Sequence, residues 1–120
     1  MNTTLTKTEY LTEAMIEQVN NLWKVNSLEN NRNFSTLLTY EVAKKYIKVY
    51  RYDTYNGEVR PGRSVFMFID KETGAVYKPA SYKAPAKGIR FYIESLAENP
   101  EVVDPYGSFL YVRWVIVTHL

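Results

Sequence analysis

The stretch "SVFMFID", residues 64–70, is a nearly continuous run of apolar residues and predicts a central strand of a sheet. Valine, isoleucine and phenylalanine favour strands because branched and aromatic side chains pack well on a pleated surface. Pro61 and Gly62 interrupt the chain just before this run. The following "KETG", residues 71–74, predicts a tight hairpin turn into a further strand at residues 75–78. The centre of the chain is therefore expected to form antiparallel strands.

Two further strands are predicted upstream of this run, at "TLLTYEV" (residues 36–42) and "KYIKVYRYD" (residues 45–53). Asn56 and Gly57 then provide the signal for a hairpin turn. Successive side chains of a strand point to opposite faces of its sheet. One face of the second strand therefore carries Ile47, Val49 and Arg51, and the other carries Tyr46, Lys48, Tyr50 and Tyr52.

Residues 8–24 have the spacing of an amphipathic helix, with Thr8 as the expected N-cap. One stripe of this helix is apolar and consists of Leu11, Met15, Val19, Leu22 and Trp23. Near the end of the chain, residues 89–99 are expected to begin as a strand and end as a short helix. Residues 104–107 predict a turn, and the apolar residues 108–118 predict the last strand.

These elements predict a single α+β domain over residues 1–120, in which an N-terminal amphipathic helix packs on a mostly antiparallel sheet of five or six strands. The sheet region is expected to extend over residues 36–118 and to include a basic, proline-containing loop at residues 78–88. Lys78 and Ala84 precede prolines and are pushed toward extended backbone, so we expect this loop to be neither helix nor paired strand. The chain has no cysteine, no start typical of a signal peptide and no apolar run that could span a membrane, so a cytoplasmic location is expected.

Charge is distributed unevenly along the chain, although the formal net charge is only +2. Residues 44–90 hold eleven basic and four acidic residues, whereas the segments on either side are mildly acidic. Within this basic block, the stretch "YKPASYKAPAKGIRF", residues 77–91, contains four cationic side chains and no carboxylate. Such an asymmetry indicates an anionic partner.

No catalytic or metal-binding signature is recognisable, so a non-enzymatic protein without cofactor or metal is expected. The single histidine, His119, lies beside the C-terminus, where the second shell that a catalytic or metal-binding histidine needs is rarely present. Asp70 and Glu72 could form a carboxylate pair, but both flank a predicted turn, where such residues are common. The glycine of "RPGRS" is not part of a P-loop pattern.

A nucleic-acid interface is the leading functional hypothesis. Tyrosines alternate with Lys48 on the strand at residues 45–53, and proteins that bind single-stranded nucleic acid combine rings that stack on bases with cations that contact the backbone. The expected stacking residues are Tyr50, Tyr52 and Tyr82. The alternative is that the strand tyrosines pack against the leading helix while Lys48 reaches out to solvent.

The loop at residues 78–88 supplies most of the expected phosphate contacts. Its prolines limit the freedom of the chain, so less entropy is lost when the loop binds. Arg60 and Arg63 are expected to approach from the neighbouring hairpin. The complete set of predicted anion-binding residues is Lys48, Arg60, Arg63, Lys78, Lys83, Lys87 and Arg90. The alternative is a solubilising loop whose lysines are simply hydrated.

Residues 70–91, "DKETGAVYKPASYKAPAKGIRF", resemble a segment of short uncharacterised proteins encoded by tailed bacteriophages. The shared pattern is D-x-x-T-G-x-V-x-K-P-A-x-[WY]-K-x-P-A-K-G-[VI]-R, which ends here at Arg90. Tyr82 occupies a position that is often tryptophan in that group, and Phe91–Tyr92 replace a small residue and an asparagine. The "DPYG" turn at residues 104–107 is similar to a G-P-Y-G turn of the group. The resemblance implies a phage origin and no particular mechanism.

We therefore expect a small non-enzymatic phage-type protein that binds an anionic partner, with nucleic acid as the leading candidate. A protein–protein module that inhibits a host or defence factor is an alternative, since a basic, tyrosine-rich surface would also suit an acidic host protein. A virion component or self-assembling protein is a second alternative, because the apolar residues 109–118 could form a homo-oligomer interface. A phage-encoded protein of this kind would act in the cytoplasm of the host.

Overall fold

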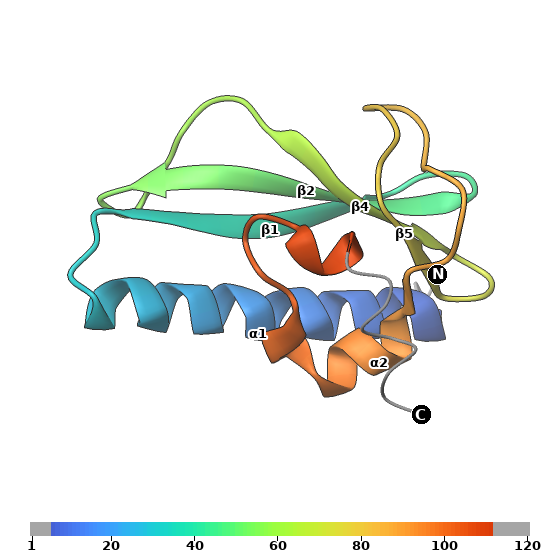
Figure 1. Cartoon of the computed structure of the whole chain (residues 1–120), viewed down its shortest axis with the longest axis horizontal. Helices are drawn as coiled ribbons and strands as arrows, with labels where there is room; N and C mark the ends of the chain where they lie inside the picture. Colours follow the sequence, from blue (N-terminus) through green and yellow to red (C-terminus); the bar gives the residue numbers. More distant parts are fainter. Residues whose placement is uncertain (1–5, 112–120) are drawn as a thin grey trace, which may run out of the picture.

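The structure is a computed structural model that describes residues 6–111. A long helix, α1 (Lys7–Glu29), lies along one face of an antiparallel sheet, which confirms the predicted α+β class (Figure 1). The sheet is formed by β1 (Phe34–Val42), β2 (Tyr46–Tyr55), β3 (Glu58–Val59), β4 (Ser64–Asp70), β5 (Ala75–Tyr77) and β6 (Phe91–Tyr92). Three short helical elements follow, namely α2 (Ile93–Glu98), η1 (Pro100–Val102) and η2 (Ser108–Leu110).

The sheet has the order β1-β2-β4-β5-β6, with β3 paired to β2. The predicted central strand is β4, which lies between β2 and β5 and is mostly buried. The register of β2 and β4 shifts between Val49 and Tyr50, so Phe66 has no partner across the strands. This bulge places Phe66 in the core together with Met67. The predicted turn at Asn56 and Gly57 is present, and both residues have the positive φ angles that such hairpin turns require.

Helix α1 is longer than the predicted segment at residues 8–24. It begins after Thr6, which forms a capping box with Glu9, so the predicted N-cap at Thr8 is wrong. Thr8 is instead buried. The helix continues to Glu29 because no glycine or proline interrupts it after residue 24. Neither α1 nor any other helix within residues 6–111 is long and apolar enough to cross a membrane.

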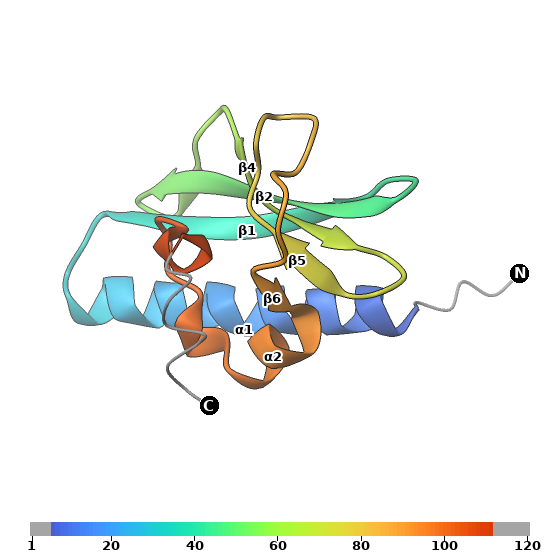
Figure 2. The same ribbon diagram turned by 45° about the vertical axis from the view of Figure 1, so that its right-hand side comes forward.

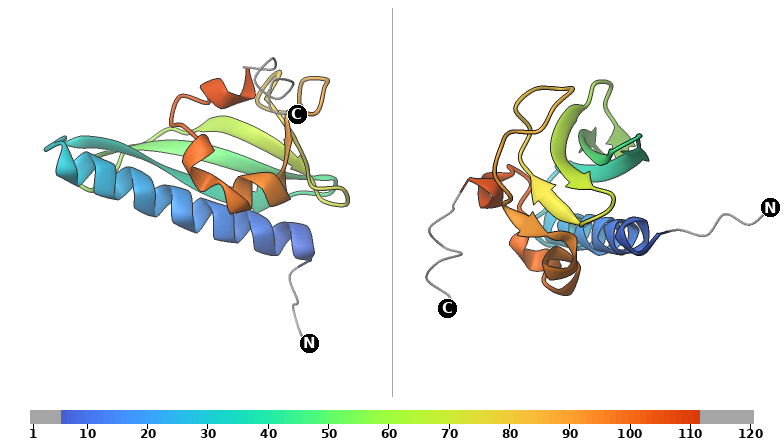
Figure 3. Two further views of the ribbon diagram at one scale, coloured as in Figure 1. Left: turned by 60° about the horizontal axis from the view of Figure 1, so that its bottom comes forward. Right: turned by 90° about the vertical axis from the view of Figure 1, so that its right-hand side faces the viewer.

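The core lies between α1 and the sheet and is closed at one side by the short elements that follow β6 (Figure 3). Apolar side chains from α1 pack against one face of β2 and β4, and the central contributors are Met15, Val19, Ile47, Val49, Met67 and Ile69. This arrangement confirms that Ile47 and Val49 share a buried face. Residues 89–99 form a strand followed by a short helix, as predicted.

The predicted last strand is wrong where the structure describes it, since Ser108–Leu110 form a 3-10 turn and the described strands end at Tyr92. Asp104 causes this difference, because its carboxylate accepts hydrogen bonds from the backbone N–H groups of Ser108 and Phe109 and winds the chain into a turn. Phe109 and Leu110 are buried within the molecule, so they cannot form the predicted homo-oligomer interface. Residues 112–118 of that prediction lie outside the described residues.

The basic loop at residues 78–88 is partly paired, which corrects the expectation of a wholly unpaired loop. Pro79 and Pro85 form an antiparallel bridge, and the N–H of Ala86 donates to the carbonyl of Lys78 over 2.8 Å. The Ser81 hydroxyl accepts from the backbone at the tip of the loop. These contacts fold the loop back on itself, so its lysines lie on a narrow, hairpin-like projection.

Asp70 is expected to stabilise the hairpin between β4 and β5. Burial raises the pKa of this carboxyl, but hydrogen bonds from the N–H groups of Thr73 and Glu72 outweigh that effect, so the pKa is lowered overall. The charged form is thus favoured by folding, and its contribution is present at neutral pH and lost as the pH falls through the lowered pKa. Asp70→Ala should reduce the free energy of unfolding by about 1–2 kcal/mol at neutral pH. Urea unfolding should show this difference shrinking as the pH falls below 3.8, the ordinary pKa of an aspartate, and a pH-independent difference would contradict the assignment.

Candidate functional site

The candidate site lies on the face of the sheet opposite α1. Two loops rise side by side from that face, the β3–β4 connection and the basic loop at residues 78–88 (Figure 2). They are joined by a hydrogen bond in which Nε of Arg63 donates to the hydroxyl of Tyr82 over 3.1 Å. The loops therefore bring residues far apart in sequence onto the outer face of β2.

Four side chains form a compact aromatic–cationic cluster on this face, namely Lys48, Tyr50, Arg63 and Tyr82. The guanidinium carbon of Arg63 lies 3.7 Å from the centre of the Tyr50 ring, which is a stacking distance. Nζ of Lys48 lies 4.8 Å from the Tyr82 ring and 5.7 Å from the Tyr50 ring. The two tyrosine rings have centres 5.9 Å apart. Each cation thus lies over aromatic surface, and the four side chains form one connected cluster.

The strand tyrosines do not pack against the leading helix, so that alternative is wrong. Ile47 and Val49 take the side facing α1, and the strand alternation puts Tyr46, Lys48 and Tyr50 on the other side. The core under the helix includes Ile47 and Val49 of β2 and none of the tyrosines of that strand. Lys48 is half-buried among rings and does not extend freely into solvent.

Glu41 on β1 is the acidic member of this site, and the sequence reading missed it. Its carboxylate lies opposite Lys48 in the β1–β2 register and is 3.0 Å from Nη1 of Arg63. The hydrogen bond with Arg63 lowers the pKa of Glu41, and hydrogen bonds to Tyr82 and Glu41 raise the pKa of Arg63. The signal was present in the sequence, since folding the hairpin about residues 43–45 pairs positions 41 and 48.

The three predicted stacking residues differ in accessibility. Tyr82 is 48% exposed and can present a ring to a ligand, whereas Tyr50 is only 2% exposed beneath Arg63 and Tyr82. Tyr50 therefore serves as the buried support of the cluster and offers no ring face to a base. Burial, followed by the nearby charge of Glu41, raises the pKa of Tyr50 to about 12. Tyr52 is half-buried, further along the same strand face.

The predicted cations outside the cluster occupy several positions. Lys83 and Lys87 are exposed on the basic loop, and Arg60 is exposed between β3 and β4. Nζ of Lys78 lies 4.4 Å from the centre of the Tyr111 ring, and the buried Nε of Arg90 has no hydrogen-bond partner among residues 6–111. Of the seven predicted cations, Arg63 alone forms an ion pair within the described part of the chain.

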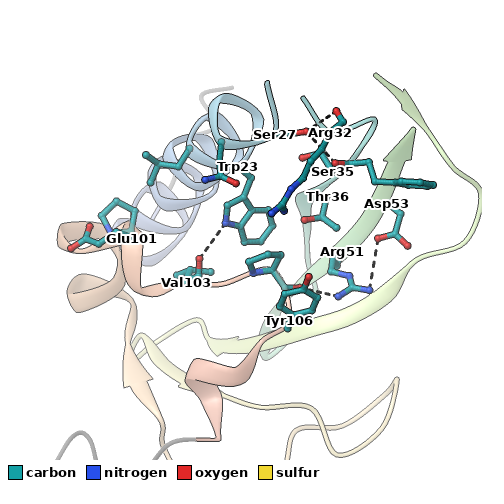
Figure 4. Close-up of a pocket in the computed structure, with 15 residues that line it drawn as sticks. Trp23, Ser27, Arg32, Ser35, Thr36, Arg51, Asp53, Glu101, Val103 and Tyr106 are labelled. Atoms are coloured by element: carbon teal, nitrogen blue, oxygen red, sulfur yellow. Dashed lines mark hydrogen bonds and ion pairs between the residues drawn. The ribbon is translucent and has the colours of Figure 1, made fainter. Parts of the chain in front are cut away.

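A cavity of about 640 Å³ lies on the other side of the sheet, and no sequence pattern had indicated it (Figure 4). Its walls come from the C-terminal half of α1, the adjoining ends of β1 and β2, and residues 100–106. Trp23, Arg32 and Arg51 are among its lining residues. The helical stripe had identified Trp23 only as a core residue, because spacing along the helix cannot show that strand ends and residues 100–106 leave a space beside this side chain.

Comparison with family models returned a match over residues 1–112, nearly the whole chain. The chain belongs to DUF7717, a family of unknown function. Neither the curated proteins nor the solved structures returned a match. The matched residues include both the aromatic–cationic cluster and the cavity. Because the function of the family is unknown, the function of this member is inferred from its own side chains.

Proposed function

We propose that this member of DUF7717 binds single-stranded nucleic acid through the outer face of its sheet. Tyr82 would stack on a base, Lys48 and Arg63 would flank it, and Lys83 and Lys87 would contact phosphates. The observation that carries the proposal is the contact of Lys48 and Arg63 with the rings of Tyr50 and Tyr82. Rings and cations at one place are what sequence-independent recognition of single strands requires.

The distribution of charge supports the same proposal. Lys83 and Lys87 are exposed on the loop that carries Tyr82 and have no ion pair within residues 6–111, so contact with phosphates would not require them to leave a carboxylate. The folded-back loop reduces the ordering cost of binding. Glu41 reduces the net positive charge of the aromatic–cationic cluster. Its pairing with Arg63 would keep that guanidinium in place beside the rings of Tyr50 and Tyr82.

The proposal is tested by fluorescence-anisotropy titration of a labelled single-stranded oligonucleotide at two salt concentrations. The double variant Lys83→Glu with Lys87→Glu should lower the affinity on the order of tenfold or more, because two phosphate contacts are lost. Its salt dependence should be shallower by about 1.4 in the log–log slope. A duplex of the same sequence should bind more weakly than the single strand, since its bases are not available for stacking.

A matched control keeps the change in net charge the same. Lys24 on α1 and Lys44 in the β1–β2 turn are exposed and lie outside the cluster, so Lys24→Glu with Lys44→Glu should change the affinity far less. Equal effects of the two double variants would mean that only overall charge matters. No binding of either oligonucleotide by the unchanged protein would end the proposal.

We also propose that the protein is encoded by a phage and acts in the cytoplasm of its host. The resemblance of residues 70–91 to proteins of tailed phages favours a phage protein, and the absence of cysteine favours the reducing cytoplasm of a host cell.

A further inference from the structure

The cavity beside α1 has the size and wall chemistry of a small-molecule site. Its volume of about 640 Å³ falls within the range of roughly 300–1,000 Å³ that is typical of such sites. It lies on the α1 side of the sheet, whereas the aromatic–cationic cluster lies on the outer face. Any ligand of this cavity is therefore separate from the proposed nucleic-acid interface.

The apolar part of the cavity is built around Trp23. The indole N–H donates to the carbonyl of Val103 over 3.3 Å, and the ring packs edge-on against Phe66 with centres 6.2 Å apart. The ring is thus held from two sides, and its polar atom is already satisfied. Phe34 and Tyr106 stand at the mouth of the cavity and are 62% and 82% exposed. An aromatic floor with exposed aromatic rims favours a flat, apolar ligand group.

Arg32 gives the cavity an uncompensated positive charge. Figure 4 shows its side chain extending into the cavity toward Trp23. It forms no ion pair within residues 6–111, whereas the other lining arginine, Arg51, lies 3.8 Å from a carboxylate oxygen of Asp53. Nη1 of Arg51 also donates to the carbonyl of Pro105 over 2.8 Å, which fixes that guanidinium. Arg32 is an exposed residue, so water can reach its guanidinium, and an anion that enters the cavity can pair with it without displacing a carboxylate of residues 6–111.

The acidic residues of the lining do not cancel this charge. Asp53 lies beside Arg51, and Figure 4 shows Glu101 on the opposite side of Trp23 from both of them. Arg32 therefore faces the space above the indole without a carboxylate partner in the described part of the chain. We propose that this cavity binds a small molecule that joins a planar aromatic ring to one anionic group, with the ring on Trp23 and the anion on Arg32.

Two classes of metabolite have this chemistry, aromatic carboxylates and nucleoside monophosphates, and paired probes separate them. Indole-3-acetate and adenosine 5′-monophosphate are titrated to millimolar concentration, together with their uncharged counterparts 3-methylindole and adenosine. Binding is followed through the indole N–H signal of Trp23 in nitrogen-15 correlation spectra, which Trp23→Phe assigns between the two tryptophans of the chain. At least one anionic probe should shift this signal saturably and more tightly than its counterpart, and the better probe identifies the class.

The variant Arg32→Gln tests the role of the anion. It should weaken the anionic probe about tenfold and leave the uncharged counterpart unchanged, because one charge-assisted hydrogen bond is lost. Lys24→Gln is the matched control, since it removes an exposed cation of α1 that does not line the cavity. Failure of both anionic probes to shift the Trp23 signal would overturn the proposal. So would equal weakening of the charged and uncharged probes by Arg32→Gln. Neither result depends on oligonucleotide binding at the outer face.

Discussion

Tyr50→Ala is expected to lower the free energy of unfolding by about 3–4 kcal/mol, because it empties the centre of the outer face of the sheet. The ring is 2% exposed and lies beneath Arg63, whose guanidinium carbon is 3.7 Å from its centre. Tyr82 and Lys48 complete its cover. Removal of the ring would also release the tip of the basic loop, so amide hydrogen exchange at residues 80–84 should accelerate. Urea unfolding monitored by circular dichroism provides the stability measurement.

Tyr50→Phe is the matched control for this prediction, since it keeps the ring and removes only the hydroxyl. The cost should stay below about 1 kcal/mol at neutral pH. The pKa of Tyr50 is raised from 10.0 to about 12, so the folded state favours its neutral form. The stability linked to this shift is fully present below pH 10.0 and is lost as the pH rises toward about 12. The phenylalanine variant should lose less stability across that window than the unchanged protein does. A Tyr50→Ala variant as stable as Tyr50→Phe would show that the outer face contributes little packing.

Asn20→Ala is expected to lower the free energy of unfolding by about 2–3 kcal/mol, because it leaves two backbone groups of an edge strand without partners. Nδ2 of Asn20 donates to the carbonyl of Leu38 over 2.9 Å, and its Oδ1 accepts from the N–H of Leu38 over 2.7 Å. Strand β1 is at the edge of the sheet, and Leu38 is 1% exposed, so water cannot easily replace the amide. One side chain of α1 thus covers part of an edge that could otherwise pair with another chain.

The neighbouring residue provides the control. Asn21 is exposed on α1 and takes part in no side-chain hydrogen bond within residues 6–111. Asn21→Ala should therefore leave the stability unchanged or raise it by a few tenths of a kcal/mol, since alanine favours helices. Thermal or urea unfolding of the two single variants makes the comparison direct. Equal stabilities of the Asn20 and Asn21 variants would show that the contact with Leu38 contributes nothing.

Patterns that act over a few residues predicted much of the fold correctly. The alternation along β2 separated Ile47 and Val49 from Lys48 and Tyr50, and the Asn56–Gly57 turn is where its signal placed it. Two wrong predictions, the last strand and the N-cap of α1, also have local causes, which residue propensities do not capture. The Asp104 carboxylate turned a strand-like sequence into the 3-10 turn at Ser108–Leu110, and Thr6 started α1 before the predicted cap. In each case a side chain satisfies backbone N–H groups and overrides the average preference of its neighbours.

The sequence alone determined that β2 has an apolar face and a tyrosine–lysine face, because side-chain alternation is a property of the strand itself. Only the tertiary structure decided that α1 covers the apolar face and that Tyr82 and Arg63 cover Tyr50. Those contacts depend on the register of three strands and on the folding-back of two loops, which no local pattern encodes. The cavity around Trp23 and Arg32 has the same origin, since it exists only where the end of a helix, two strand ends and residues 100–106 meet.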